Sequence, residues 1–159
     1  MTNTGYIVPA LRAVLEGVNG ARMVSAKVAA LFGRRKHHLM ATVRRDGSPR
    51  LSGTEVSIGD GAFGFGVMTG AVRLVDLGRD PRVAIHCQGI DPPEHDHSAW
   101  EGEAKLSGRA LAAPTQSEAG EFFVVDIDEV VLTSMGSPAD HLVIEHWTPT
   151  AGRTVTPRY

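Results

Sequence analysis

Residues 38–50 read HLMATVRRDGSPR, and this stretch decides the fold because it predicts a β-hairpin. His38 to Arg44 has the composition of a strand. The turn signal follows in Asp46-Gly47-Ser48-Pro49, where the glycine takes positive φ and the proline fixes the exit of the backbone. Arg50 to Ile58 then alternates in polarity, as a returning strand does. The sequence therefore predicts antiparallel strands around this hairpin.

The residues after the hairpin continue the sheet. Gly59-Asp60-Gly61 predicts a second tight turn and Ala62 to Met68 a third strand, so the three strands form a meander. A polar, proline-rich loop is predicted over residues 88–98. Further strands are predicted at residues 82–87, 100–111, 122–135 and 141–147. About six or seven strands at this spacing favour a mainly β fold that closes, or nearly closes, into a barrel.

Short helices are expected to flank these strands. Two are predicted between residues 8 and 33, with a break at Asn19-Gly20, and one around residues 115–120. Another is predicted within residues 69–78, where Arg73 and Asp76 are expected to point outward. The apolar residues that fit this helix are Val72, Leu74, Val75 and Leu77. We expect one domain over residues 1–159, with an N-terminal helical segment over residues 1–36.

Composition narrows the possible partners. The 159 residues carry a formal net charge of −2, which argues against general binding to nucleic acids or anionic membranes. Met1 to Leu15 lacks the pattern of a signal peptide, and no window reaches the roughly 20 apolar residues of a membrane span. Cys87 is the single cysteine, so no internal disulfide can form. We expect a cytoplasmic protein with neither nucleic acid nor membrane as a partner.

The segment from Met68 to Arg73 is a candidate phosphate site. A strand leads through Thr69 and Gly70 into a helix with an arginine in its first turn. The N–H groups at a helix start favour an anion, and arginine adds a charge-assisted contact. Ordinary turn chemistry, which more often accounts for a glycine and an arginine near a helix start, is the alternative.

Two further groups of residues are candidates for contact with a ligand. Ser52, Gly53 and Thr54 are small and permit close approach of the backbone, although a solvated edge strand has the same composition. Trp147, followed by Arg153 and Arg158, offers an aromatic wall and cations. A tryptophan that closes the mouth of the barrel is the alternative.

The sequence gives little support for metal binding or for catalysis by a nucleophilic side chain. His95-Asp96-His97 invites a metal hypothesis, but the spacing lacks a structural-zinc pattern, and we expect no metal. Cys87 has no base beside it except His86, which an extended strand directs to the opposite side. No catalytic residue is assigned.

Taken together, three segments resemble the pyridoxamine 5′-phosphate oxidase-like family of FMN-binding split barrels. Residues 38–50 are similar to its A-T-x-x-x-D-G-x-P hairpin, and residues 70–84 to its K-x-x-x-L-x-x-D-P-R segment. Residues 100–110 are similar to its long G-x-A strand, and the likeness extends roughly over residues 30–148. It implies a homodimer of six-stranded split β-barrels with short flanking helices. FMN, or alternatively the deazaflavin F420, would lie in a groove between the subunits.

The resemblance also implies a function and a set of site residues. It points to an FMN- or F420-dependent oxidoreductase that transfers hydride to a small molecule; the alternative is a non-enzymatic protein of the same fold that binds or stores FMN, F420 or haem. Val155 and Pro157 stand where the true oxidases carry a histidine and an arginine, so pyridoxamine phosphate itself is not the expected substrate. The expected cofactor contacts are Arg50, Ser52, Gly53, Thr54, Met68, Thr69, Arg73 and Trp147.

Overall fold

The computed structural model describes residues 25–59, 62–114 and 118–159. The helix expected before Asn19, the turn at Asp60-Gly61 and residues 115–117 of another expected helix lie outside the described residues. The helices are α2 (Ala26–Gly33), α3 (Val72–Arg79) and the short 3-10 helix η1 (His97–Ala99). The strands are β1 (His37–Val43), β2 (Pro49–Gly59), β3 (Ala62–Met68), β4 (Arg82–His86), β5 (Glu103–Ala113), β6 (Gly120–Met135), β7 (Leu142–Thr148) and β8 (Gly152–Arg158).

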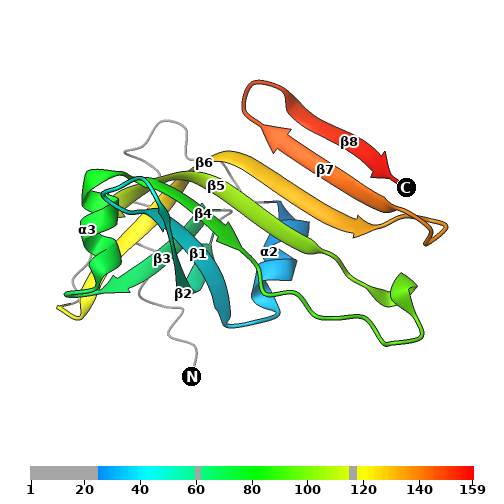
Figure 1. Cartoon of the computed structure of the whole chain (residues 1–159), viewed down its shortest axis with the longest axis horizontal. Coiled ribbons are helices and arrows are strands. Elements are labelled where there is room, and N and C mark those ends of the chain that lie inside the picture. The colour runs from blue at the N-terminus through cyan, green and yellow to red at the C-terminus, as the bar shows by residue number, and fades with distance from the viewer. Residues whose placement is uncertain (1–24, 60–61, 115–117) are drawn as a thin grey trace.

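All eight strands belong to one antiparallel sheet, and six of them close into a barrel (Figure 1). Their order is β3-β2-β1-β4-β5-β6, and pairing of β3 with the first residues of β6 closes the ring. The end of β6, from Val130 to Met135, pairs instead with β7, which in turn pairs with β8. The barrel is therefore open along the second half of β6, where the β7–β8 hairpin extends away from it. The mainly β, barrel-forming prediction is confirmed.

The barrel interior is filled by alternate side chains of the strands. Phe63 and Phe65 of β3 are fully buried, as are Met40 of β1 and Ile85 of β4. Helix α2 covers one end, where the ring of Phe32 meets that of Phe63 at a centroid distance of 4.9 Å, edge to face. Each such side chain stabilises the fold by about 1.5–3 kcal/mol through removal of apolar area from water.

The structure differs from the predicted strands at two places, the start of β5 and the existence of β8. The long strand expected from Trp100 begins at Glu103, because Gly102 takes φ of 96° and a Cβ there would meet the carbonyl oxygen of Thr133. Strand β8 was not predicted at all. Its residues are mostly exposed, and among the described strands it pairs only with β7. Its sequence therefore lacks the alternation of apolar and polar residues that burial of one face produces.

The outward orientation expected for Asp76 is wrong. Asp76 is only 2% exposed, whereas Val72 and Val75 of the same helix are 59% and 67% exposed. The carboxylate is buried because side chains of β1 and β2 donate hydrogen bonds to it.

Within the described residues, no helix is both long and apolar enough to cross a membrane.

Candidate cofactor site at the start of α3

The chain turns sharply between β3 and α3. Gly70 takes φ of 81°, a conformation that suits glycine, and Ala71 N–H donates to Met68 O at 3.1 Å. Ala71 is the N-cap of α3, and among the described residues no side chain caps this helix start. The first N–H groups of a helix have no partner within the helix, so this end of α3 favours an acceptor that carries negative charge.

Arg73, in the first turn of α3, is held against β2. Its Nη1 donates to Gly53 O at 2.6 Å. Its Nε is buried and has no hydrogen-bond partner among the described residues. Burial lowers the pKa of the guanidinium from its usual value, yet arginine stays charged at neutral pH. A buried donor without an acceptor costs about 1–3 kcal/mol, so an anionic oxygen beside Nε would remove an existing penalty.

A second contact ties α3 to β2 one helical turn further on. Arg50 Nε donates to Asp76 Oδ2 at 2.6 Å, and Thr42 Oγ1 donates to the same oxygen at 2.9 Å. Arg79 Nη2 lies 3.4 Å from Asp76 Oδ1. The hydrogen bond from Arg50 is the main cause that holds the pKa of the Asp76 carboxyl below its usual value. The structure thus places both Arg50 and Arg73 on the contact between β2 and α3.

The other predicted residues of β2 and β3 surround this contact in different ways. Ser52 is half-buried and Gly53 exposed, while the Thr54 side chain points into the protein, with only 3% of the residue exposed. Met68 is 72% exposed at the end of β3. Thr69 Oγ1 donates to Glu118 O at 3.3 Å. A ligand at the start of α3 would therefore reach the backbone, not the hydroxyl, of Thr54.

Trp147 lies in a different part of the chain. It is on β7, opposite Val130 of β6 and Arg153 of β8. Figure 1 shows the β7–β8 hairpin and α3 on opposite sides of the molecule. Trp147 lines a cavity of about 470 Å³ that α2 also borders. Within one chain, the structure does not bring Trp147 to the seven other predicted site residues.

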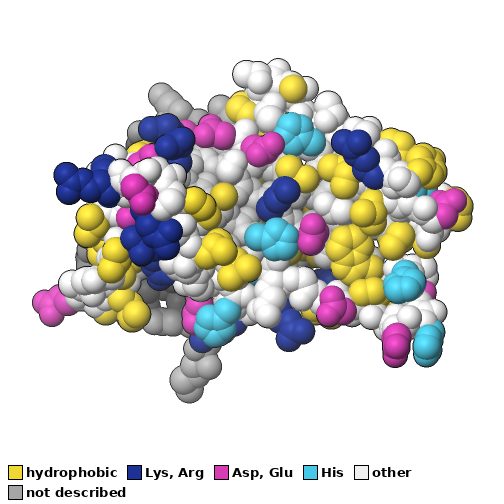
Figure 2. Space-filling view, in the orientation of Figure 1, with side chains coloured by type: hydrophobic (Ala, Val, Ile, Leu, Met, Phe, Trp, Pro, Cys, Tyr) yellow, Lys and Arg dark blue, Asp and Glu magenta, His cyan; other side chains and the backbone are white. Residues whose placement is uncertain are grey.

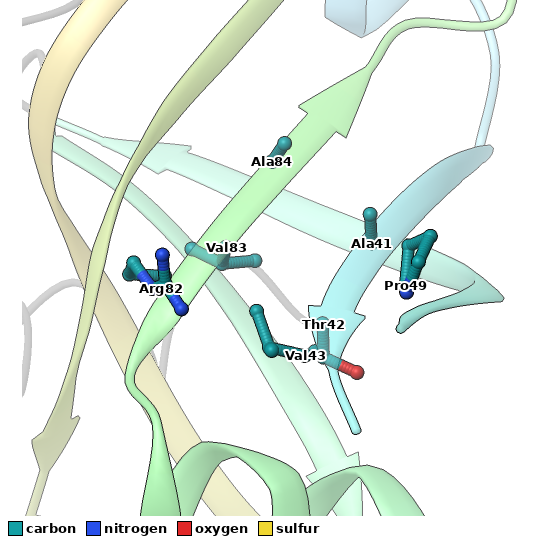
Figure 3. Close-up of a pocket in the computed structure, with 7 residues that line it drawn as sticks. All are labelled: Ala41, Thr42, Val43, Pro49, Arg82, Val83 and Ala84. Carbon is teal, nitrogen blue, oxygen red and sulfur yellow. The ribbon is translucent and has the colours of Figure 1, made fainter. Parts of the chain in front are cut away.

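Apolar side chains are exposed on the outer face of β1, β2 and β4. Leu39 and Leu51 are 54% and 69% exposed. Leu51 pairs with Ala41, which pairs with Ala84, so these side chains share one side of the sheet. A hollow of about 180 Å³ lies between the same three strands (Figure 3). We call this surface the outer apolar face; its residues are Leu39, Ala41, Val43, Pro49, Leu51 and Ala84.

The histidine-rich loop presents its side chains to solvent. His95 and His97 are both exposed. Across the part of the chain that the structure describes, no three His, Cys, Asp or Glu side chains are grouped so that they could hold a metal ion. Cys87 is buried and its Sγ accepts from Ala104 N–H at 3.0 Å. Burial raises the pKa of this thiol, which suits a core residue better than a nucleophile.

Sequence reasoning missed Asp76 and its partner Thr42. A weak signal for Thr42 was present, since it shares the inward parity of His38 and Met40 on one strand. A hydroxyl directed into a core needs a hydrogen-bond partner, which the strand itself does not supply. Nothing in the local pattern around Asp76 indicated that it is this partner.

Comparisons with known proteins support the architecture. No family model matches the sequence, nor does any curated protein. Among solved structures, a pyridoxamine 5′-phosphate oxidase-related, FMN-binding protein from Nostoc punctiforme PCC 73102 is similar, with a TM-score of 0.58. It is 9% identical over 83% of this chain and 94% of its own.

Two other similar structures are of proteins named for other ligands. A heme-binding protein from Mycobacterium smegmatis has a TM-score of 0.55 and 15% identity over 84% of this chain and 88% of its own. An F420 reductase has a TM-score of 0.53 and 16% identity over 67% of this chain and 98% of its own. Identities this low bear on architecture alone. The chain has the fold of the pyridoxamine 5′-phosphate oxidase-like, FMN-binding split barrels.

Proposed function

We propose that this chain binds FMN, or alternatively F420, with the cofactor phosphate at the start of α3. The observation that carries the proposal is Arg73, whose buried Nε has no partner among the described residues and whose Nη1 is already fixed on Gly53. A phosphate oxygen would accept from Nε and from the first N–H groups of α3. The residues present thus fit the phosphate end of a flavin nucleotide.

The remaining predicted contacts have distinct roles in the proposal. Arg50 adds a second cation from β2. Ser52 and Gly53 leave space for a ring along the strand because their side chains are small or missing. Met68 and Thr69 flank the site from the end of β3. When bound, the cofactor supplies hydride transfer, and the protein positions it and tunes its electrostatic surroundings.

We further propose that the protein acts as a homodimer and reduces a small molecule. The outer apolar face supports a second copy as partner, because exposed apolar side chains on adjoining strands lose contact with water when two copies meet. A second copy also offers a way to bring Trp147 to a cofactor that it cannot reach within its own chain. The cofactor would then lie between subunits, as the family resemblance implies.

The test is cofactor binding by the purified protein. Titrations with FMN, F420 and riboflavin, followed by fluorescence, are expected to give saturable binding of FMN or F420. Arg73→Ala should weaken binding of the phosphate-bearing cofactor by about tenfold to a hundredfold, as for loss of a charge-assisted hydrogen bond. Arg109→Ala is the matched control, since Arg109 is an exposed arginine on β5 that does not line the hollow of the outer apolar face.

The outcomes separate the proposal from its alternatives. Binding of neither FMN nor F420 by the wild-type protein would overturn it. Equal losses for Arg73→Ala and Arg109→Ala would contradict the phosphate position. An absorption band of haem in the purified protein, lost in His95→Ala/His97→Ala, would instead support a haem-storage protein. Turnover of reduced cofactor with a panel of small acceptors distinguishes an oxidoreductase from a binding protein.

A further inference from the structure

Asp76 is a buried carboxylate that connects three elements around the candidate site. Only 2% of the residue is exposed. Its oxygens accept from Thr42 of β1 at 2.9 Å and from Arg50 of β2 at 2.6 Å, while Arg79 of α3 approaches to 3.4 Å. A buried carboxylate with donors from separate elements has little freedom to move, because any shift breaks charge-assisted bonds in a poorly solvated place.

The two contacts between β2 and α3 are three residues apart on both the strand and the helix. Arg50 meets Asp76, and Gly53, three residues later on the strand, meets Arg73, three residues earlier on the helix. Strand and helix therefore run in opposite directions past each other. The Asp76 bond sets the position of the first turn of α3, and with it the position of Arg73.

The same bond also orients Arg50. Asp76 accepts from Nε of this guanidinium, and the bond leaves its two Nη groups available to face another acceptor. Arg73 and Arg79 belong to α3 and Arg50 lies beside it on β2, and Asp76 offsets only one of these three charges. Figure 2 shows several Lys and Arg side chains, with Asp and Glu among them, at the end of the molecule where α3 lies. The excess of positive charge suits a phosphate.

We propose that Asp76 is the positioning residue of the phosphate site: it fixes Arg50 and the first turn of α3, so that Arg50 and Arg73 together bind the phosphate of the cofactor. This inference rests on the proposed function. Asp76 itself does not touch the cofactor, and its effect is transmitted through Arg50 and α3.

The readout is the phosphate increment, defined as the affinity for FMN divided by the affinity for riboflavin. If only F420 binds, F420 and its phosphate-free deazaflavin replace them. Asp76→Asn keeps the size of the side chain but removes its charge, and should lower the increment by about tenfold. The affinity for riboflavin should change less than about twofold, since riboflavin carries no phosphate for the arginines to bind. A purely structural role would weaken both ligands alike.

Matched variants sharpen the test. Asp80→Asn also removes an aspartate paired with an arginine, but at the C-terminal end of α3, away from Arg73, and should leave the increment unchanged. Arg50→Gln should lower the increment about as much as Asp76→Asn. The double variant should lower the phosphate increment no further than either single variant, because both substitutions remove the same contact between Arg50 and Asp76. Thermal unfolding and far-UV circular dichroism check that each variant is folded.

Three results would overturn the inference. The first is an unchanged increment in Asp76→Asn, and the second is an equal fall of the increment in Asp80→Asn. The third is a loss in the double variant that equals the product of the losses in the two single variants. Should Asp76→Asn not fold, Thr42→Val removes one donor and leaves the Arg50 ion pair in place. That variant should lower the increment about twofold, and no change would likewise overturn the inference. A wild-type protein with no phosphate increment would instead contradict the proposed function itself.

Discussion

At the start of α3, single side chains decide what the site can bind. The Nε of Arg73 is a buried donor without an acceptor among the described residues, which raises the free energy of the ligand-free protein. The nearby carboxylate of Asp76 already has hydrogen-bond partners, because Thr42, Arg50 and Arg79 donate to it. An anion is therefore expected beside Arg73 and not beside Asp76.

The pairing of Asp76 predicts how stability depends on pH. The folded-state pKa of Asp76 lies below its usual value, first because Arg50 donates to it. The stabilisation is thus present above about pH 4 and is lost as the pH falls through the folded-state value. At neutral pH, Asp76→Asn should lower the free energy of unfolding by about 1–3 kcal/mol.

Urea unfolding at pH 7 and at pH 3 measures both quantities. Asp46, Asp80 and Asp140 also have lowered pKa values, so the wild-type protein loses stability in acid for several reasons. The informative number is the difference between wild type and Asp76→Asn, which should shrink at pH 3. A difference that stays constant with pH would contradict the assigned ion pair.

The sequence identified Arg73 as a candidate but misjudged Asp76, and the reason is physical. Helical periodicity identifies a buried face from apolar residues, and Val72 and Val75 belong to the apolar set of this helix. In the folded protein these two valines are exposed, and the polar contact between Asp76 and the strands determines how the helix lies. Such a contact joins residues 26 and 34 positions apart, which local spacing cannot reveal.

At the scale of the elements, glycines fix where β5 and β6 meet. Gly102 precedes β5 with φ of 96°, and its Cα lies against the backbone of Thr133. Gly66 of β3 has open space at its Cβ position and no positive φ. These two positions therefore differ in what a methyl group would cost.

Gly102→Ala should destabilise the protein by about 2 kcal/mol or more, because alanine rarely adopts positive φ and its Cβ would meet the Thr133 carbonyl. Gly66→Ala is the control and should change the free energy of unfolding by less than about 1 kcal/mol. Denaturant unfolding of both variants measures the difference. Equal effects would show that the close approach of β5 to β6 does not constrain the fold.

Some strands can be predicted from the sequence and others cannot. Residues 62–68 were predicted with the bounds that the structure gives, because a turn signal at residues 59–61 precedes this short apolar run in the sequence. Strand β8 was missed because it contains Pro157, is mostly polar and exposed, and pairs with no described strand other than β7. Its existence depends on β7 offering an edge, which is a property of the folded sheet.

At the scale of the whole molecule, the outside of the ring carries an exposed apolar surface. Leu39 and Leu51 lie on the outer apolar face, beside the hollow between β1, β2 and β4. Exposed apolar groups on a monomer are stabilised when a second copy covers them. The homodimer implied by the family resemblance would use this kind of surface.

Leu51→Lys should therefore shift the protein from dimer to monomer, because it places a charge where two copies would meet. Ile90→Lys is the control, since Ile90 is also exposed but lies in the loop after β4. Sedimentation velocity at about micromolar concentration, a range in which specific dimers persist, distinguishes the two states. A monomeric wild-type protein, or an equal effect of both variants, would contradict the dimer proposal.

The most direct measurement is a crystal structure of the protein soaked with FMN, or with F420 if only that cofactor binds. We expect the phosphate within hydrogen-bond distance of Arg73 Nε and of the first N–H groups of α3, with Arg50 on its other side. A cofactor bound with its phosphate elsewhere, and Arg73 Nε still without an acceptor, would contradict the central claim.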